Sequence, residues 1–463
     1  MTSCCGSSSS WRVSVVEVSA RRRRDIIGAL RRGTVPQHGL DVMAVGLTRF
    51  EAAIDAELDA AAAGGAGFKA VRGEYGSGKT FYARWLIERA KKRGFATAEV
   101  QVSETETPLH RLETVYRRII ENLTTAEAQP SALREVIDGW FHVLEEDAIE
   151  AGADRADDVA VQRGAAALLE RRLETVSRSA PAFAAALRGY RKATILGDVV
   201  QAEGLLGWLG GQPHVASSVR RAAGVRGELD HFGALGFLQG MLTVLKDSDY
   251  RGMVVVLDEV ETLQRVRSDV REKSLNSLRQ LVDEIDAGRF PGLYLVITGT
   301  PAFYDGQQGM QRLPPLAQRL AVDFATDSRF DNPRAPQIRL PGFSLASLEE
   351  LGSRVRDMYA SGADAPDRVL RVVDDAYLGD LARGVAGRLG DKVGVAPRLF
   401  LKKLIADVLD RVDLFPDFDP RRDYALTVGA AELTDSERDA AHLGELRDIS
   451  PLSSVDEIDL DLS

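Results

Sequence analysis

A glycine-rich run that ends in lysine and threonine constrains this chain more than any other feature. The run reads Gly73-Glu74-Tyr75-Gly76-Ser77-Gly78-Lys79-Thr80. It follows a short apolar segment, 68–72, typical of a strand, and precedes an amphipathic segment, 81–93, typical of a helix. Glycines let a backbone curl around an anion and aim its N–H groups at it, and a helix N-terminus attracts the same charge. The pattern predicts a phosphate-binding loop in an α/β fold.

Two side chains of this loop have predicted roles of their own. Lys79 should reach the β- and γ-phosphates of ATP, and the Thr80 hydroxyl should hold Mg²⁺. The remaining residues, from Gly73 to Gly78, should bind the nucleotide mainly through the backbone.

A second motif supplies carboxylates. The apolar run 253–257 is typical of a strand buried on both faces, and Asp258 and Glu259 follow it directly. Asp258 is expected beside the metal, and Glu259 is expected to polarise the attacking water. A polar loop is the plain alternative for two acids after a strand. Their occurrence downstream of a phosphate loop favours an ATPase.

Thr298 and Thr300 end the next apolar run, 293–297, and could position the attacking water, although threonine at a strand end often serves local bonding. Arg312 and Arg319 follow, and either could contact the γ-phosphate bound by a neighbouring subunit. Ordinary surface arginines are the alternative for both.

Strands are predicted at five short apolar runs, 68–72, 96–102, 253–257, 293–297 and 338–340. Helical patterns join them, which indicates a parallel sheet. One helix should start at Pro108, because Thr107 can cap it and proline suits the first helical position. Towards the C-terminus, helices are expected over 345–359, 369–389 and 397–412. Arg398 opens the last of these after Gly394, and could close a lid on the nucleotide or simply begin a helix.

The chain divides into six predicted parts. They are a disordered leader (1–20), the first part of an ATPase core (21–110), a helical insertion (111–250), the second part of the core (251–340), a C-terminal helical domain (341–433) and an acidic tail (434–463).

Composition excludes several classes of protein. The net charge of -10 argues against a protein that coats nucleic acid by bulk electrostatics. The basic run 21–24 has two interpretations, a solvated start of a helix or a local contact with DNA or RNA. The two cysteines, Cys4 and Cys5, cannot build a disulfide framework. No secretory signal or membrane-spanning run is recognisable, so a cytoplasmic location without membrane partners is expected.

The order of the motifs along the chain resembles that of AAA+ ATPases of the origin-recognition-like branch. These motifs are the phosphate loop, Asp258-Glu259, Thr298 and the segment 394–398. The resemblance implies a parallel sheet flanked by helices, interrupted here by the long insertion, and a C-terminal helical lid or winged-helix-like domain. It also implies that the segment before the loop cradles adenine, with Val35 and Pro36 and with Val45 and Gly46.

A closer resemblance lies in sequence outside these motifs. The segments 21–27, 33–36, 72–80, 103–110 and 257–261 are similar to the BrxD family of ATP-binding proteins from BREX bacteriophage-exclusion systems. This resemblance implies a homo-oligomer that acts with other BREX components in restricting phage DNA. Three functions stay open: an ATPase that assembles or remodels complexes on DNA, a nucleotide-gated scaffold with little turnover, and a module that binds duplex DNA.

Overall fold

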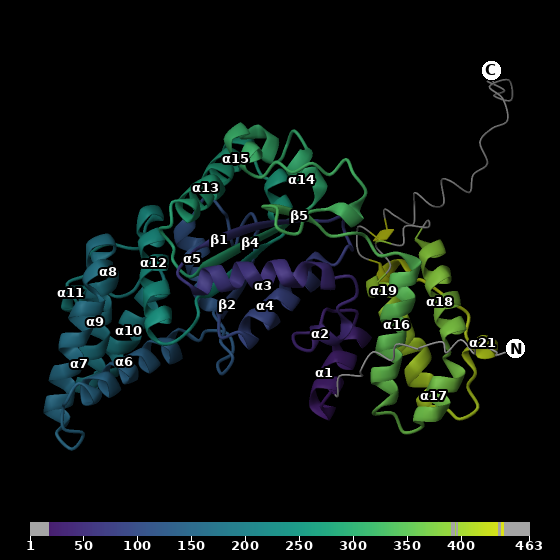
Figure 1. The fold of residues 1–463 in the computed structure, drawn as a ribbon, viewed down its shortest axis with the longest axis horizontal. Helices are drawn as coiled ribbons and strands as arrows, with labels where there is room; N and C mark the ends of the chain where they lie inside the picture. The colour runs from purple at the N-terminus through teal and green to yellow at the C-terminus, as the bar shows by residue number, and fades with distance from the viewer. Residues whose placement is uncertain (1–17, 390–393, 395–396, 434–436, 439–463) are drawn as a thin grey trace, which may run out of the picture. The chain divides into compact units, whose positions relative to one another are not determined.

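The computed structural model describes residues 18–389, 394, 397–433 and 437–438 (Figure 1). These residues form two compact units, one comprising 46–342 and the other the described parts of 1–45 and 343–463. Most of the predicted leader and acidic tail lies outside the described residues. The predicted domain boundaries remain predictions.

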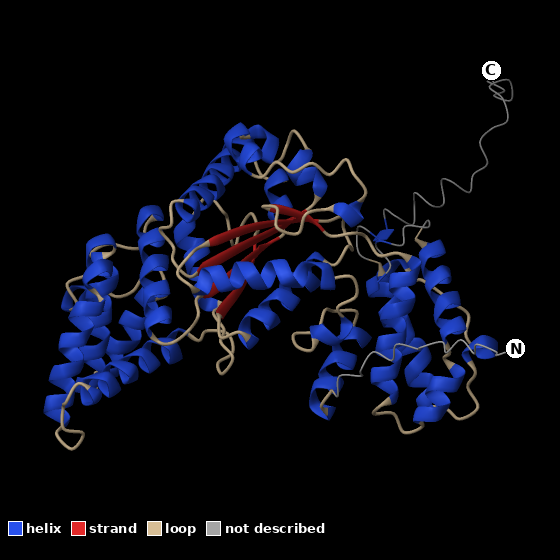
Figure 2. Cartoon of the chain, in the orientation of Figure 1, coloured by secondary structure: helices blue, strands red, loops and turns tan. Residues whose placement is uncertain are grey.

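A five-stranded sheet forms the centre of the first unit (Figure 2). Its strands are β1 (Gly67–Arg72), β2 (Ala96–Gln101), β3 (Met253–Asp258), β4 (Leu293–Gly299) and β5 (Gln337–Arg339). Their order is β2-β3-β4-β1-β5, and every neighbouring pair is parallel. All five predicted strands are therefore confirmed. Every residue of β3 and β4 is buried, as expected for a parallel sheet covered on both faces.

The strand register brings the carboxyl ends together at one edge. Arg72 of β1 lies opposite Gly299 of β4, and Gln101 of β2 lies opposite Asp258 of β3. Because β4 lies between β1 and β3, its end separates the glycine-rich loop from the paired acids. In open α/β sheets, ligands bind at this edge.

Helices cover the sheet and fill the long segment between β2 and β3. Around the sheet lie α3 (Thr48–Ala62), α4 (Lys79–Lys92), α5 (Leu112–Glu121), α12 (His231–Asp247), α13 (Ser268–Asp286), α14 (Pro301–Asp305) and α15 (Pro314–Arg319). The helices from α6 to α11 are α6 (Leu133–Glu150), α7 (Asp158–Arg172), α8 (Glu174–Ser179), α9 (Pro181–Leu196), α10 (Val199–Leu209) and α11 (Ser217–Ala222). They extend away from the sheet in Figure 1.

The second unit is helical throughout its described residues. Its longer elements are α1 (Ala20–Arg31), α16 (Leu345–Ala360), α17 (Pro366–Val372), α18 (Asp375–Arg388), α19 (Pro397–Lys402), a π-helix (Lys403–Leu409) and α20 (Asp410–Leu414). The Arg31 guanidinium of α1 pairs with the Asp410 carboxylate of α20 at 2.6 Å, so segments far apart in the sequence join in this unit. Among the described residues, no helix is both long and apolar enough to cross a membrane.

Two predicted helix boundaries are wrong. The helix expected from Pro108 begins instead at Leu112. Ser103 accepts a hydrogen bond from the Thr107 amide at 3.0 Å and closes a turn there, while Leu109 is fully buried. The expected helix 369–389 is two helices, because the Asp374 side chain caps α18 by accepting the Tyr377 amide at 2.8 Å.

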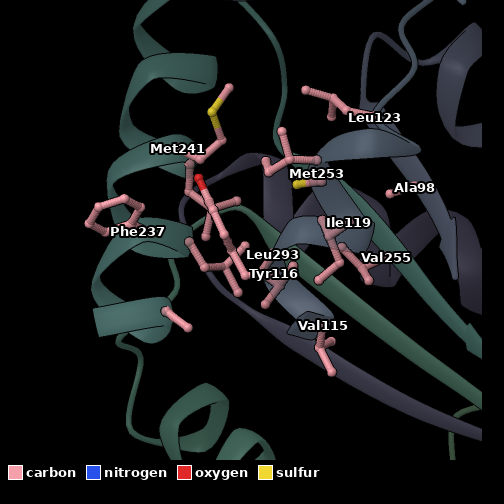
Figure 3. Close-up of a cluster of buried hydrophobic side chains, with 14 of the residues drawn as sticks. Ala98, Val115, Tyr116, Ile119, Leu123, Phe237, Met241, Met253, Val255 and Leu293 are labelled. Carbon is pink, nitrogen blue, oxygen red and sulfur yellow. The ribbon is translucent and has the colours of Figure 1, made fainter. Parts of the chain in front are cut away.

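The insertion and the sheet share one hydrophobic core (Figure 3). Tyr116 of α5 packs against Phe237 of α12, with ring centroids 5.7 Å apart, and Ile119 of α5 lies beside the strand residue Val255. The Phe237 ring also meets Phe183 of α9 and Trp208 of α10, with ring centroids 5.2 and 5.0 Å apart. Phe237 therefore links the outer helices of the insertion to the helices on the sheet.

We expect Phe237→Ala to lower the free energy of unfolding by about 3 to 5 kcal/mol, because it leaves a cavity where four helices meet. Phe232→Ala, on the same helix with Phe232 76% exposed, is the matched control and should change it by less than about 0.5 kcal/mol. Urea unfolding followed by circular dichroism and tryptophan fluorescence measures both. Equal stability of the two variants would contradict this packing.

Candidate functional site

The glycine-rich loop joins the end of β1 to the start of α4, and its backbone requires glycine. Gly76 and Gly78 have φ angles of 79° and 89°, in the left-handed region that side chains disfavour. A Cβ on Gly73 would lie 2.2 Å from Ser77 Oγ, closer than any real contact. The loop is therefore a tight cradle directly before the N-terminus of α4, a position that favours an anion.

Lys79, the first residue of α4, is buried against this loop with 8% of its surface exposed. Its Nζ donates to the carbonyl oxygens of Gly73 and Glu74, at 3.0 and 3.3 Å. The same ammonium lies 3.6 Å from Glu261 Oε1 and 5.0 Å from the centre of the Tyr75 ring. The lysine predicted to bind phosphates thus lies inside the cradle, held by acceptors of the protein itself.

The Asp258 carboxylate accepts hydrogen bonds from hydroxyl groups on two other elements. Thr80 Oγ1 of α4 donates to its Oδ2 at 3.1 Å, and Thr298 Oγ1 of β4 donates to its Oδ1. The three predicted residues therefore meet at the carboxyl edge of the sheet.

A hydroxyl and a carboxylate side by side fit Mg²⁺, which takes few protein ligands and completes its octahedron with water and phosphate oxygens. Across the described ranges, no group of three or more His, Cys, Asp or Glu residues is arranged to hold a metal ion. Thr80 and Asp258 would supply the protein ligands here.

Glu259 has an unusual backbone conformation, with φ 60° and ψ 43°. Its amide donates to Asp258 Oδ1 at 3.1 Å and to Thr298 Oγ1 at 3.3 Å, and these bonds hold the left-handed turn. Its side chain turns to the neighbouring strand, where Gln101 Nε2 donates to Glu259 Oε2 at 2.7 Å. A non-glycine residue in this conformation costs energy and is common at functional sites.

Gln101 and Glu261 are site residues that the sequence analysis missed. Gln101 ends β2, and its only signal was a polar residue at the end of a predicted strand. Glu261 lies two residues after Glu259, in the short 3₁₀ helix Val260–Gln264, and is 6% exposed. Burial raises the pKa of its carboxyl group, and the Lys79 ammonium partly opposes that shift.

The other predicted site residues of this unit form hydrogen bonds or ion pairs away from the glycine-rich loop. Arg312 donates to Ser268 Oγ, at the start of α13, at 3.1 Å. Arg319 pairs with two carboxylates near the end of α13, Asp283 at 2.8 Å and Asp286. Thr300 is buried and precedes α14. The predicted roles of the two arginines on a neighbouring subunit's nucleotide stay predictions.

Val35, Pro36 and Arg398 belong to the other unit. Arg398 Nε donates to Glu437 Oε1 at 3.0 Å, and its guanidinium also bonds to the Glu432 carbonyl oxygen. Their predicted contacts with the nucleotide stay predictions as well.

Comparison with solved structures finds the Aeropyrum pernix ORC2 protein in its ADPNP–ADP complexes, at 12% identity and a TM-score of 0.32. The match covers 78% of this chain and 66% of that one, just under two thirds of its length. A likeness this remote supports no inference about function. No curated protein matches the chain.

The family comparison is far more extensive. Residues 18–428 match the family described as BREX system ATP-binding protein BrxC/D. This range includes the glycine-rich loop, the paired acids and Thr298. Because the match covers well over half of the chain, the protein belongs to the BrxC/D family of BREX system ATP-binding proteins.

Proposed function

We propose that this protein binds Mg²⁺–ATP at the glycine-rich loop and hydrolyses it. The observation that carries the proposal is the meeting of Lys79, Thr80, Asp258 and Thr298, from α4, β3 and β4, at the carboxyl edge of the sheet. Family membership independently supports ATP as the ligand. The magnesium ion, when bound, would neutralise negative charge on the phosphates.

Each side chain then has a distinct task. The backbone N–H groups of the loop bind phosphate oxygens, and Lys79 exchanges its two carbonyl acceptors for the β- and γ-phosphates. Thr298 holds Asp258 in position through one carboxylate oxygen, which leaves the other beside the Thr80 hydroxyl. Glu259 accepts a proton from the attacking water as the water bonds to the γ-phosphorus, and the bond from that phosphorus to the β–γ bridging oxygen breaks, so that ADP leaves with the bonding electrons.

Gln101 restrains the carboxylate that this mechanism needs. In the structure its amide occupies Glu259 Oε2 at 2.7 Å, on the side of β2. We propose that hydrolysis requires Glu259 to leave Gln101, so that turnover stays low until the site rearranges. This observation also favours the second candidate function, a nucleotide-gated scaffold with little turnover.

At the level of the whole protein, we propose that ATP drives assembly or remodelling of a complex on phage DNA together with other BREX components. Family membership supports the BREX context. A homo-oligomer would let Arg312 or Arg319 reach the nucleotide of a neighbouring subunit. The arginine would there stabilise the negative charge on the γ-phosphate during hydrolysis.

Two substitutions separate binding from chemistry. Lys79→Ala should weaken ATP binding by about 100-fold or more, measured with a fluorescent ATP analogue, because the loop loses the ammonium that lies inside it. Glu259→Gln should keep binding and lower turnover by about 100-fold or more, because the amide cannot accept the proton. Glu272→Gln, on the exposed face of α13, is the charge-matched control and should behave as wild type. Wild-type turnover in the Glu259 variant would remove the hydrolysis proposal.

Gln101→Ala should raise basal ATP turnover by roughly tenfold, equivalent to about 1.4 kcal/mol of restraint on Glu259. The dissociation constant for ATP should stay within about twofold, since Gln101 bonds to Glu259 and not to the loop. Steady-state phosphate release and analogue binding give the two values. Unchanged or lower turnover would show that this hydrogen bond is not a restraint.

Duplex DNA should increase ATP turnover if the protein acts on DNA. Phosphate release measured with and without duplex, with Glu259→Gln as the background control, tests this. Light scattering with and without ATP gives the size of the assembly in the same buffer. Assembly with ATP but no measurable hydrolysis, with or without DNA, would favour the scaffold over the remodelling enzyme.

A further inference from the structure

Glu261 is a third carboxylate in the site, beside the two that the mechanism uses. The left-handed turn at Glu259 reverses the chain after β3, and the following 3₁₀ helix carries Glu261 back towards the loop. Its Oε1 lies 3.6 Å from Lys79 Nζ, and both side chains are more than nine-tenths buried. Its other oxygen, Oε2, is buried and has no hydrogen-bond partner within the described part of the chain.

This arrangement is costly for a carboxylate. A buried charge is normally paired and fully hydrogen-bonded, because burial removes the water that would stabilise it. Here the Lys79 ammonium and, to a smaller extent, the backbone of Glu261 itself only partly offset the burial of its carboxylate, and Asp258 and Glu259 add repulsion from nearby. The Tyr304 hydroxyl, which is also buried close by, donates to the Val71 carbonyl oxygen at 3.3 Å. Lys79 is the cation that pairs with Glu261 in the described part of the chain.

The acceptors of Lys79 explain why such a carboxylate is present. Two carbonyl oxygens and Glu261 surround an ammonium that the proposed function assigns to phosphates. Phosphates that enter the cradle must take Lys79 from these acceptors. They must also approach a fixed negative charge.

We propose that Glu261 is an internal competitor of the nucleotide phosphates for Lys79, which stabilises the empty loop and weakens nucleotide binding so that product can leave. The inference rests on the proposed function, because it requires the phosphates at Lys79. It assigns Glu261 a positioning role in nucleotide affinity and none in activating water.

The test is the affinity of the full-length protein for Mg²⁺–ADP, measured by isothermal titration calorimetry. Glu261→Gln keeps the shape of the side chain and removes its charge, and should tighten ADP binding about tenfold. Glu261→Asp keeps the charge but withdraws it from Lys79 by one methylene, and should tighten binding by a smaller factor. The Asp variant also keeps the test available if the Gln variant does not fold.

A double-mutant cycle identifies Lys79 as the intermediary. In a Lys79→Met background, with ADP titrated to millimolar concentration, Glu261→Gln should change affinity at least threefold less than it does in the wild type. Weaker or unchanged ADP binding in folded Glu261→Gln would overturn the inference, as would equal tightening in both backgrounds. Failure of the proposed function looks different, because wild-type protein would then bind ADP or ATP no better than Lys79→Ala.

Discussion

The Asp258 carboxylate holds the site together. One oxygen accepts the Thr80 hydroxyl, and the other accepts the Thr298 hydroxyl and the Glu259 amide. These bonds join β3 to α4 and β4. They also stabilise the left-handed backbone turn at Glu259, which fixes the direction of its side chain. A buried carboxylate needs such donors, since an unsatisfied charge at 5% exposure would be costly. The relative positions of Thr80, Thr298 and Glu259, which carry the proposed roles in metal binding and water activation, therefore depend on one side chain.

The sheet makes this convergence possible. Parallel strands bring their carboxyl ends to one edge, and the order β3-β4-β1 places the end of β4 between the loop and the acids. The helical insertion leaves this order intact, because α5 and α12 pack on the sheet and share its core. The outer helices can then extend from the sheet without disturbing the site.

In the structure, two groups with proposed roles in the site interact with other side chains of the protein. Lys79 is near Glu261, and Glu259 accepts the Gln101 amide. The first interaction engages the ammonium proposed to bind phosphates, and the second engages the carboxylate proposed to accept a proton from water. Under our proposals, Glu261 would adjust nucleotide binding and Gln101 would separately adjust turnover.

The sequence by itself was enough to predict the loop, the paired acids and all five strands, because each depends on local patterns: glycine spacing, apolar runs and the residues that follow them. It wrongly started one helix at Pro108 and missed the break at Asp374 within the expected helix 369–389, where a serine hydroxyl and an aspartate cap decide the local fold. Gln101 and Glu261 became site residues only in three dimensions. The register of β2 against β3 brings Gln101 to Glu259, and the left-handed turn at Glu259 returns Glu261 to Lys79. Such contacts join residues 158 and 182 positions apart, and only the packed sheet brings them together.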